Sequence, residues 1–254
     1  MKPVLAVMYR EYLIRRTSLT WMFFDVMVPL LYLLMFGVAF DRALGTSFLI
    51  DGTSIRYNAF FLAGVLSMTC FGNAVNQSYG FFIDRDNGIF FEHLTYPLTR
   101  GELLLGKILF QGLMTIVQAS VTLIAGIVIL GVDIRISMLP FIFAGVVLGT
   151  AGWFFCLSSA TFLIRRNDTF NMVINASYFI LMFISSLFYP IDQLPIWLKI
   201  PSRCNPLTWH TDVMRYLTIG LGNLQLTIIY SLLFIVFLIT SFFVAQRMIQ
   251  HATD

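Results

Sequence analysis

The sequence predicts an all-α integral membrane protein, and three observations support that class. Only 11% of the 254 residues are charged and 58% are hydrophobic, whereas soluble domains carry about 25% charged residues. Six apolar stretches are long enough to cross a hydrocarbon core about 30 Å thick, which needs roughly 20 helical residues. None of them alternates apolar and polar side chains, as the strands of a membrane barrel do. The composition excludes a soluble enzyme, a secreted disulfide scaffold and a disordered tail.

Residues 1–19 are expected to form an amphipathic interfacial helix on the inner membrane surface. Apolar side chains recur there at helical spacing among basic neighbours, namely Val4, Leu5, Met8, Tyr12 and Leu13. A merely charged flank to the first span is the alternative. The first span, 20–40, is longer than a signal-peptide core, and Phe40, Asp41 and Arg42 make a poor cleavage site. We therefore predict a permanent helix.

The other spans are predicted at 58–82, 107–130, 138–164, 169–189 and 226–247. Six spans put both termini on one side of the membrane. With the termini in the cytoplasm, ten of the 16 Lys and Arg residues lie inside and six outside, and cytoplasmic loops carry the excess of basic residues. We expect a single transmembrane domain over 1–254, in a cell (inner) membrane, with both termini cytoplasmic.

The inner connection at 84–106 is longer than a bundle needs and is predicted to be a docking segment. Its side chains are of two kinds, charged (Asp84, Arg85, Asp86 and Glu92) and apolar (Ile89, Phe90, Phe91 and Leu94). We expect a short helix to start at Asn87 and stop at Pro97. Thr99 and Glu102 fit the capping box of the next helix, so the third span is expected to begin from a fixed hinge.

Four prolines punctuate the outer connection between the last two spans, at Pro190, Pro195, Pro201 and Pro206, and each is expected to interrupt a continuous helix. The residues between them are too apolar for a free loop. Short broken helices dipping into the outer leaflet, with Trp197 and Trp209 at headgroup depth, account for both facts. A small external cap packed on the bundle is the alternative.

The sequence carries no convincing catalytic or metal site. His93, His210 and His251 have no metal-ligand partner at helical spacing. The segment 101–107 stops one residue short of a phosphate-binding loop, because Ile108 stands where a Ser or Thr is needed and no strand precedes it. We expect a chain that is not an enzyme and does not hydrolyse ATP alone. Its scattered basic residues also do not predict nucleic-acid binding.

Polar side chains within the spans leave two interpretations open. Asp25 is the one carboxylate well inside a span, and it either pairs with an inner-surface Arg or lines a path. Other polar residues fall on single helix faces: Asn73, Asn76 and Gln77, with the small Gly80 on the same face; Gln111, Thr115, Gln118 and Thr122; Asn171 and Asn175. These sets are either glue between helices or the lining of a groove for the polar part of a substrate.

Two segments resemble the motif regions of ABC-2 type transporter permeases, the membrane subunits of a class of ABC exporters that includes drug and lipo-oligosaccharide exporters. Residues 92–107 read EHLTYPLTRGELLLGK, and residues 205–215 read NPLTWHTDVMR. The length, the amphipathic start, the six spans and the long external segment extend the resemblance over essentially the whole chain.

This resemblance implies a permease that dimerises, with two copies of an ATP-binding subunit beneath it. By position, 84–96 would be the coupling helix that enters a cleft of that subunit. Phe90, Phe91 and Leu94 would be its apolar anchors, Asp84, Arg85 and Glu92 its rim, and Arg100 and Glu102 the turn into the third span. Residues 190–220 would form re-entrant external helices, as in type V exporters, with a gate at Trp197, Pro206, Trp209 and Arg215. ATP and Mg²⁺ would be bound by the partner.

The function that follows is an ATP-driven exporter of an amphipathic or lipid-linked substrate. Its possible path through the membrane is lined by Asp25, Asn73, Asn76, Gln77, Gln111, Gln118, Asn171 and Asn175. An ion-coupled secondary transporter and a non-transporting membrane scaffold are the alternatives. A secondary transporter commonly holds ionisable groups at mid-membrane, and here Asp25 alone qualifies.

Overall fold

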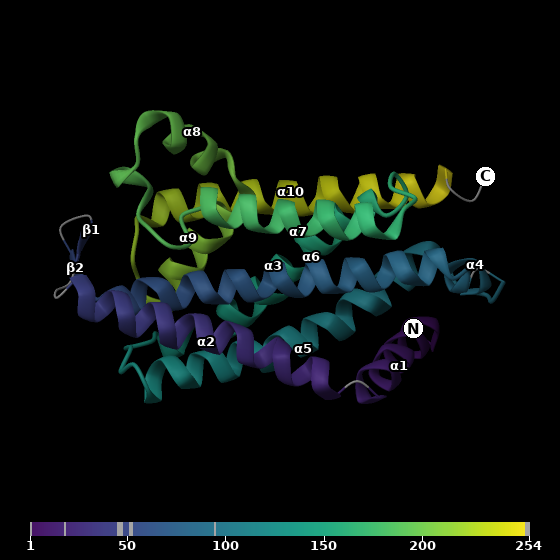
Figure 1. Cartoon of the computed structure of the whole chain (residues 1–254), viewed down its shortest axis with the longest axis horizontal. Coiled ribbons are helices and arrows are strands. Elements are labelled where there is room, and N and C mark those ends of the chain that lie inside the picture. The colour runs from purple at the N-terminus through teal and green to yellow at the C-terminus, as the bar shows by residue number, and fades with distance from the viewer. Residues whose placement is uncertain (1, 18, 45–47, 51–52, 94, 252–254) are drawn as a thin grey trace.

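Long helices run side by side along the molecule in this computed structural model, which describes residues 2–17, 19–44, 48–50, 53–93 and 95–251 (Figure 1). They are α2 (Leu19–Leu44), α3 (Tyr57–Asp86), α5 (Arg100–Val128), α6 (Leu139–Ala160), α7 (Asn167–Ile184) and α10 (Leu224–His251). The described ends of α1 (Lys2–Thr17) and α10 lie at the same end of the bundle as α4 (Ile89–His93). A short antiparallel hairpin, β1 (Phe48–Ile50) with β2 (Thr53–Ile55), lies at the other end and was not predicted.

Among the residues that the structure describes, five helical segments are long and apolar enough to cross a membrane: α2, α3, α5, α10, and α6 together with the short helix η1 (Ile136–Met138). Five of the six predicted spans are therefore present as candidate spans. The sixth, predicted at 169–189, corresponds to α7, which ends at Ile184 and carries Asn167, Asp168 and Asn171 in its first turns. These polar residues lower the mean hydropathy of α7, and the helix is not among the five candidate spans. Six spans therefore remain a prediction.

Helix α3 lies at the centre of the bundle and packs against α2, α5, α6, α7 and α9 (Pro206–Ile219). Its aromatic side chains Phe61, Phe71 and Phe81 are fully buried. A Cβ added at Gly64 would lie 2.7 Å from the main-chain oxygen of Leu187, so glycine permits the close approach of the chain that follows α7. Most of α2 and α10, by contrast, stays exposed on the outside of the bundle.

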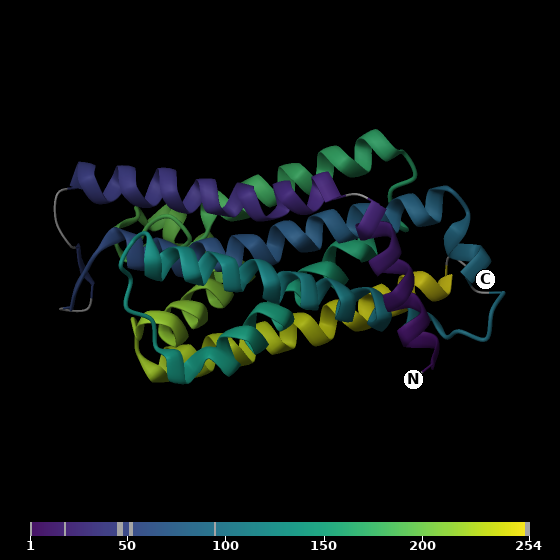
Figure 2. The same cartoon turned by 90° about the horizontal axis from the view of Figure 1, so that it is seen from below.

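Helix α1 forms as predicted and crosses the long helices near the α4 end of the bundle (Figure 2). We call this the inner end, and the opposite one the outer end, after the predicted orientation of the chain. It packs on α5, where a Cβ added at Gly106 would lie 2.6 Å from Val7 Cβ. The predicted apolar stripe is divided, because Leu5 and Tyr12 are exposed while the bundle side buries Val7 and Glu11. The helix is thus part of the helical bundle as well as a candidate for the membrane surface.

The inner connection differs from its predicted bounds. Helix α3 continues through Asp84 and Arg85 to Asp86, Asn87 caps it, and Gly88 adopts a left-handed conformation with φ of 77°. The predicted helix over 84–96 is therefore wrong in extent, and α4 itself is short.

The next helix opens as predicted, from the capping box of Thr99 and Glu102. The Thr99 hydroxyl accepts a hydrogen bond from the Glu102 main-chain nitrogen at 3.2 Å, and the Glu102 carboxylate accepts one from the Thr99 nitrogen at 2.9 Å. Helix α5 consequently starts at Arg100, before the apolar span does.

The outer connection contains short broken helices: η2 (Ile191–Gln193), α8 (Ile196–Cys204) and α9. Pro195 directly precedes α8 and Pro206 opens α9, as helix-interrupting prolines should, but Pro201 lies inside α8. Helix α8 lies level with the outer turns of α7 and α10, rather than beyond the ends of α2 and α3 (Figure 1). How deep it sits in a bilayer stays a prediction.

Candidate functional site: the α4 end of the bundle and the polar seam

The aromatic residues of α4 face two directions. Phe90 is fully buried, with its ring edge-on to Phe81 at 5.6 Å and to Phe162 at 5.6 Å between ring centroids. Phe91 is 46% exposed. The expectation that both rings anchor a partner is therefore corrected, because Phe90 holds α4 onto its own chain and Phe91 alone of the two is accessible. Leu94, the third expected anchor, lies outside the described residues.

Two of the expected rim residues also point inward. Arg85 donates hydrogen bonds to the main-chain oxygens of Thr161 and Ile164 at the end of α6, and its guanidinium lies 4.5 Å from the Phe82 ring centroid. Asp84 is 8% exposed. Glu92 remains on the surface of α4, and Arg100 and Glu102 mark the first turn of α5.

Asp84 belongs to a buried quartet of charges that joins α1, α3 and α5. Lys107 Nζ lies 2.6 Å from Glu11 Oε1 and 2.6 Å from Asp84 Oδ2. Arg10 donates to both Asp84 oxygens, at 2.7 and 3.1 Å, and to Glu11 Oε1 at 3.1 Å. Two cations and two carboxylates balance, so the desolvated charges are paired, as buried ions must be. The quartet fastens the inner ends of three helices together, directly beside α4.

The sequence prediction missed the quartet as a unit. The sequence predicts a surface helix over residues 1–19, which include Arg10 and Glu11, and a span that begins at Lys107. The available signal was a lysine inside an otherwise apolar helix, which needs a buried partner of opposite charge.

Asp25 on α2 pairs with Arg15 of α1. Arg15 Nη1 lies 2.9 Å from Asp25 Oδ2. Asn76 Nδ2 donates to Asp25 Oδ1 at 3.2 Å, and Arg15 Nη2 donates to Gln111 Oε1 at 3.4 Å. The carboxylate is thus neutralised by a cation of the inner surface helix.

Several of the polar residues expected to line a path form hydrogen bonds between helices. Asn73 Nδ2 on α3 donates to Thr115 Oγ1 at 3.0 Å and to Gln118 Oε1 at 2.5 Å, both on α5. Thr150 of α6 extends this seam by donating to Thr115 Oγ1 at 3.3 Å. Gln77 Nε2 donates to Glu11 Oε2 at 3.4 Å. These contacts are the hydrogen bonds by which membrane helices associate.

Other predicted polar residues line a cavity of about 250 Å³ between α2, α3 and α7. Its polar lining includes Asp25, Asn73, Asn76 and Asn175, and its apolar lining includes Phe24, Val28 and Met68. Asn171 Oδ1 accepts a hydrogen bond from Asn175 Nδ2 at 2.6 Å, but Asn171 does not line the cavity. Gln77, Gln111 and Gln118 are not part of the lining either. Asn73 thus belongs to both the seam and the cavity wall, Gln118 to the seam alone, and Asp25, Asn76 and Asn175 to the cavity wall.

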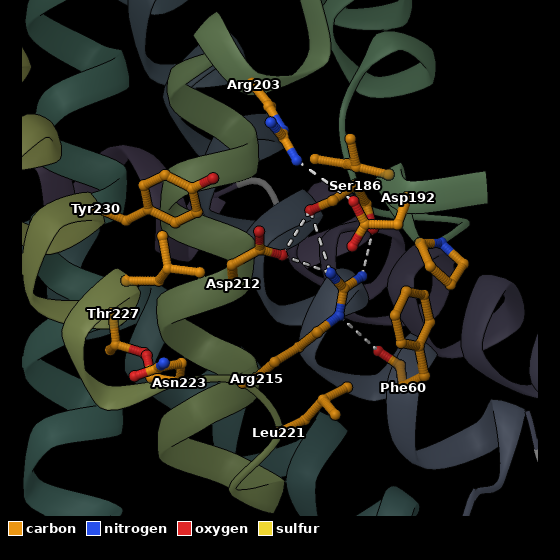
Figure 3. Close-up of a pocket in the computed structure, with 14 residues that line it drawn as sticks. Phe60, Ser186, Asp192, Arg203, Asp212, Arg215, Leu221, Asn223, Thr227 and Tyr230 are labelled. Carbon is orange, nitrogen blue, oxygen red and sulfur yellow. Dashed lines mark hydrogen bonds and ion pairs between the residues drawn. The ribbon is translucent and has the colours of Figure 1, made fainter. Parts of the chain in front are cut away.

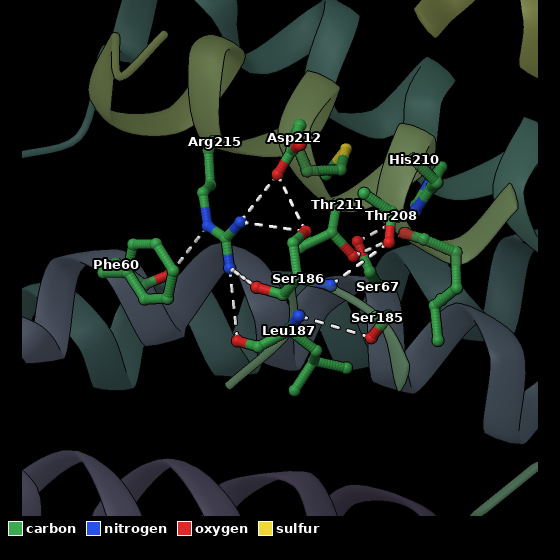
Figure 4. A network of polar contacts seen from close by, with 12 residues as sticks. Phe60, Ser67, Ser185, Ser186, Leu187, Thr208, His210, Thr211, Asp212 and Arg215 are labelled. Atoms are coloured by element: carbon green, nitrogen blue, oxygen red, sulfur yellow. Dashed lines mark hydrogen bonds and ion pairs between the residues drawn. The ribbon is translucent and has the colours of Figure 1, made fainter. Parts of the chain in front are cut away.

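At the outer end, the buried Arg215 of α9 joins three parts of the chain (Figure 4). Its guanidinium donates to Asp212 Oδ1 at 2.7 Å, to Ser186 Oγ at 3.1 Å, and to the main-chain oxygens of Ser186 and Leu187, the latter at 3.2 Å. It also donates to the Phe60 oxygen at 3.4 Å and lies 3.6 Å from the Phe60 ring centroid. Burial lowers the pKa of Arg215 to about 10, opposed by Asp212, so the group stays cationic at neutral pH.

The remaining expected gate residues do not cluster with Arg215. Trp197 is 73% exposed on α8, and Trp209 Nε1 donates to the Arg203 oxygen at 2.6 Å. Pro206 is the first residue of α9. Ser186, Asp212 and Arg215 instead form one wall of an outward pocket of about 160 Å³ (Figure 3).

His210 is a buried residue that the sequence prediction set aside. Its Nδ1 lies 2.9 Å from Ser67 Oγ and its Nε2 lies 3.0 Å from the Gly145 oxygen. Because a carbonyl oxygen accepts but never donates, Nε2 carries the proton and Nδ1 accepts from the serine. Burial lowers the pKa of His210 to about 4, so the ring is neutral and joins α9 to α3 and α6. Within the described ranges, no cluster of His, Cys, Asp and Glu could hold a metal ion.

These features define a multi-pass helical membrane protein of the transport-permease class, with an exposed aromatic at its inner face and a polar cavity between its helices. The ABC-2 type transporter family model matches residues 3–219, and the chain belongs to that family. It is similar to proteins named putative transport permease ycf38. The match to the protein of Cyanophora paradoxa is 29% identical and covers 76% of this chain and 66% of the relative.

Matches of 26% and 27% identity to the proteins of Pyropia yezoensis and Porphyra purpurea each cover 76% of this chain and 65% of the relative. The chain thus spans just under two thirds of the length of the relatives it matches.

Proposed function

We propose that this chain is the permease subunit of an ATP-driven exporter that moves an amphipathic or lipid-linked substrate out of the cytoplasm. Two copies of a separate ATPase subunit bind ATP and Mg²⁺ and dock beneath a permease homodimer in an inner membrane, with both termini of the chain in the cytoplasm. The observation that carries the proposal is the shape of α4 in a chain of this family. The helix is fixed to its own bundle by Phe90 while it presents Phe91 outward.

A rigidly mounted aromatic is suited to dock in a partner. Exposed Phe91 and Tyr96, 46% and 61% accessible, supply the large apolar contacts that dominate interfaces. Glu92 lies beside them on the surface and suits a polar rim. Movement of α4 reaches α3 and α5 directly, since α4 is joined to both by short connections.

The cavity between α2, α3 and α7 supports an amphipathic substrate. Asn76 and Asn175 offer amide groups on one part of its lining, while Phe24, Val28 and Met68 are apolar. Sites of this mixed kind orient a ligand by a few polar groups and hold it by apolar contact. The seam centred on Asn73 and Gln118 is assigned to helix association instead, because its groups already bond one another.

Co-purification tests the docking role of Phe91. Phe91→Ala should reduce the recovery of the ATPase subunit with the gently solubilised permease at least fivefold, while the permease still inserts in the membrane. Phe141→Ala is the matched control, since Phe141 is 61% exposed at the outer start of α6. Full recovery of the ATPase with the Phe91 variant, or uptake of solute by the permease reconstituted without any ATPase, would show the proposal to be wrong.

A further inference from the structure

We propose that the Arg15–Asp25 ion pair is a mechanical link that carries movement of the inner helix ends to α2 and so sets the width of the cavity between α2, α3 and α7. The inference rests on the proposed function, because it names the residues that pass on the motion of an ATPase. Arg15 Nη1 lies 2.9 Å from Asp25 Oδ2, and the two side chains are 18% and 8% exposed. The pair is therefore shielded from the water that weakens surface ion pairs.

Helix α2 follows α1 directly in the chain and packs against α3 and α5, and the ion pair adds a fixed side-chain contact to these connections. Helix α4 is joined through short segments to α3 and α5, but not to α2. Helix α1 is fastened to the inner ends of α3 and α5 by Lys107, which contacts Glu11 of α1 and Asp84 of α3. Among the described residues, Arg15–Asp25 is the ion pair that joins α1 to α2. Besides the packing of α2 on α3 and its chain connection to α1, two successive sets of charges therefore tie α2 to the helices that α4 joins.

The position of Asp25 turns that displacement into a change of the cavity. Asp25 lies in the α2 wall together with Phe24 and Val28, and Asn175 and Tyr178 of α7 also line the cavity. A pull on Asp25 therefore moves one wall relative to the other.

A direct role of Asp25 in binding a cationic substrate is disfavoured by the same contacts. Arg15 already neutralises the carboxylate, and Asn76 occupies its second oxygen at 3.2 Å. A neutralised pair tied between two helices is suited to positioning rather than to ligand binding. We therefore describe Arg15 and Asp25 as positioning residues.

The test measures the distance between spin labels on the inner halves of α2 and α7 in the assembled permease–ATPase complex, with and without ATP and Mg²⁺. Phe23 and Met172, 59% and 67% exposed, are replaced by cysteine for labelling, after Cys156 and Cys204 have been changed to serine. In the parent complex, nucleotide should shift the distance distribution. In Arg15→Gln the shift should fall at least fivefold, while ATP hydrolysis and ATPase recovery stay within twofold of the parent.

Two further variants separate the link from a general defect. Arg16→Gln makes the same change one residue along α1, where the side chain is exposed and has no ion pair within the described part of the chain, and it should keep the full shift. The exchange Arg15→Asp with Asp25→Arg should restore the shift to at least half.

The link is refuted if Arg15→Gln keeps the parent shift, if it loses ATP hydrolysis or ATPase recovery as well, if the exchange restores nothing, or if the parent itself shows no shift. Failure of the proposed function is a different result, in which no ATPase subunit is recovered with the parent permease.

Discussion

Replacing Lys107 with methionine should lower the free energy of unfolding by about 3 kcal/mol, since removing one partner of a buried ion pair costs roughly 3 to 5 kcal/mol. Lys107 is 3% exposed and contacts two carboxylates at 2.6 Å each, which are themselves 9% and 12% exposed. Its loss leaves Glu11 and Asp84 to share Arg10. We expect the lower end of the range because Arg10 stays within 3.1 Å of both. Methionine retains the apolar stem, so packing changes little.

The measurement is unfolding by dodecyl sulfate in mixed micelles, followed by circular dichroism. Adding Glu11→Gln to Lys107→Met leaves one carboxylate and one guanidinium, and this neutral pair should return stability to within about 1 kcal/mol of the parent, as expected when no buried charge is uncompensated. Lys199→Met is the control, because Lys199 pairs with an Asp192 side chain that is 75% exposed, and surface pairs contribute about 0 to 1 kcal/mol. A loss below 1 kcal/mol for Lys107→Met, or no recovery in the double variant, would refute the reasoning.

Two further predictions concern the contact between α6 and α9. Gly149→Ala should lower the free energy of unfolding by about 1 to 3 kcal/mol through overpacking, because the added Cβ would lie 2.4 Å from His210 Nε2. Thermal unfolding measures the loss. Gly80→Ala is the control and should leave stability unchanged, because there is open space around Gly80. Acidification should also weaken the fold: the pKa of His210 is about 4 when folded against 6.5 for an ordinary histidine, so the unfolded chain binds more protons between these values. Stability contributed by the neutral ring is present above pH 6.5 and falls by about 3 kcal/mol as pH drops to 4. His210→Gln should flatten that dependence in unfolding measured at pH 7 and 4.5, whereas an unchanged slope would contradict it.

Hydropathy located the helices that cross the bundle because the thickness of a bilayer dictates their apolar length. It did not give their full extent. Helix α3 continues to Asp86 and α5 begins at Arg100, in segments that are polar yet helical because a buried quartet and a capping box stabilise them. The capping box was predictable, since its two residues are three positions apart. The hairpin had a signal too, as Asp51 and Gly52 form a pair typical of two-residue hairpin turns.

The candidate site was less predictable because its contacts join distant parts of the chain. Arg10 and Asp84 are 74 positions apart, and Glu11 and Lys107 are 96 apart, so no local pattern pairs them. The orientation of Phe90 and Phe91 was partly accessible from sequence. Neighbouring residues on a helix point about 100° apart, so two adjacent rings rarely enter the same partner. Which ring is buried depends on Phe81 and Phe162 of the surrounding chain.

The contacts of Arg215 impose an order on biosynthesis. The ribosome makes α7 and the carbonyl groups of Ser186 and Leu187 before it makes the guanidinium that binds them. Until α9 emerges, these carbonyls have no cationic partner, and unpaired main-chain groups are costly away from water. The end of the bundle that holds Arg215 can therefore mature only late in translation. A chain that stops before α9 should remain a substrate for quality-control proteases even though most of its hydrophobic segments have already left the translocon.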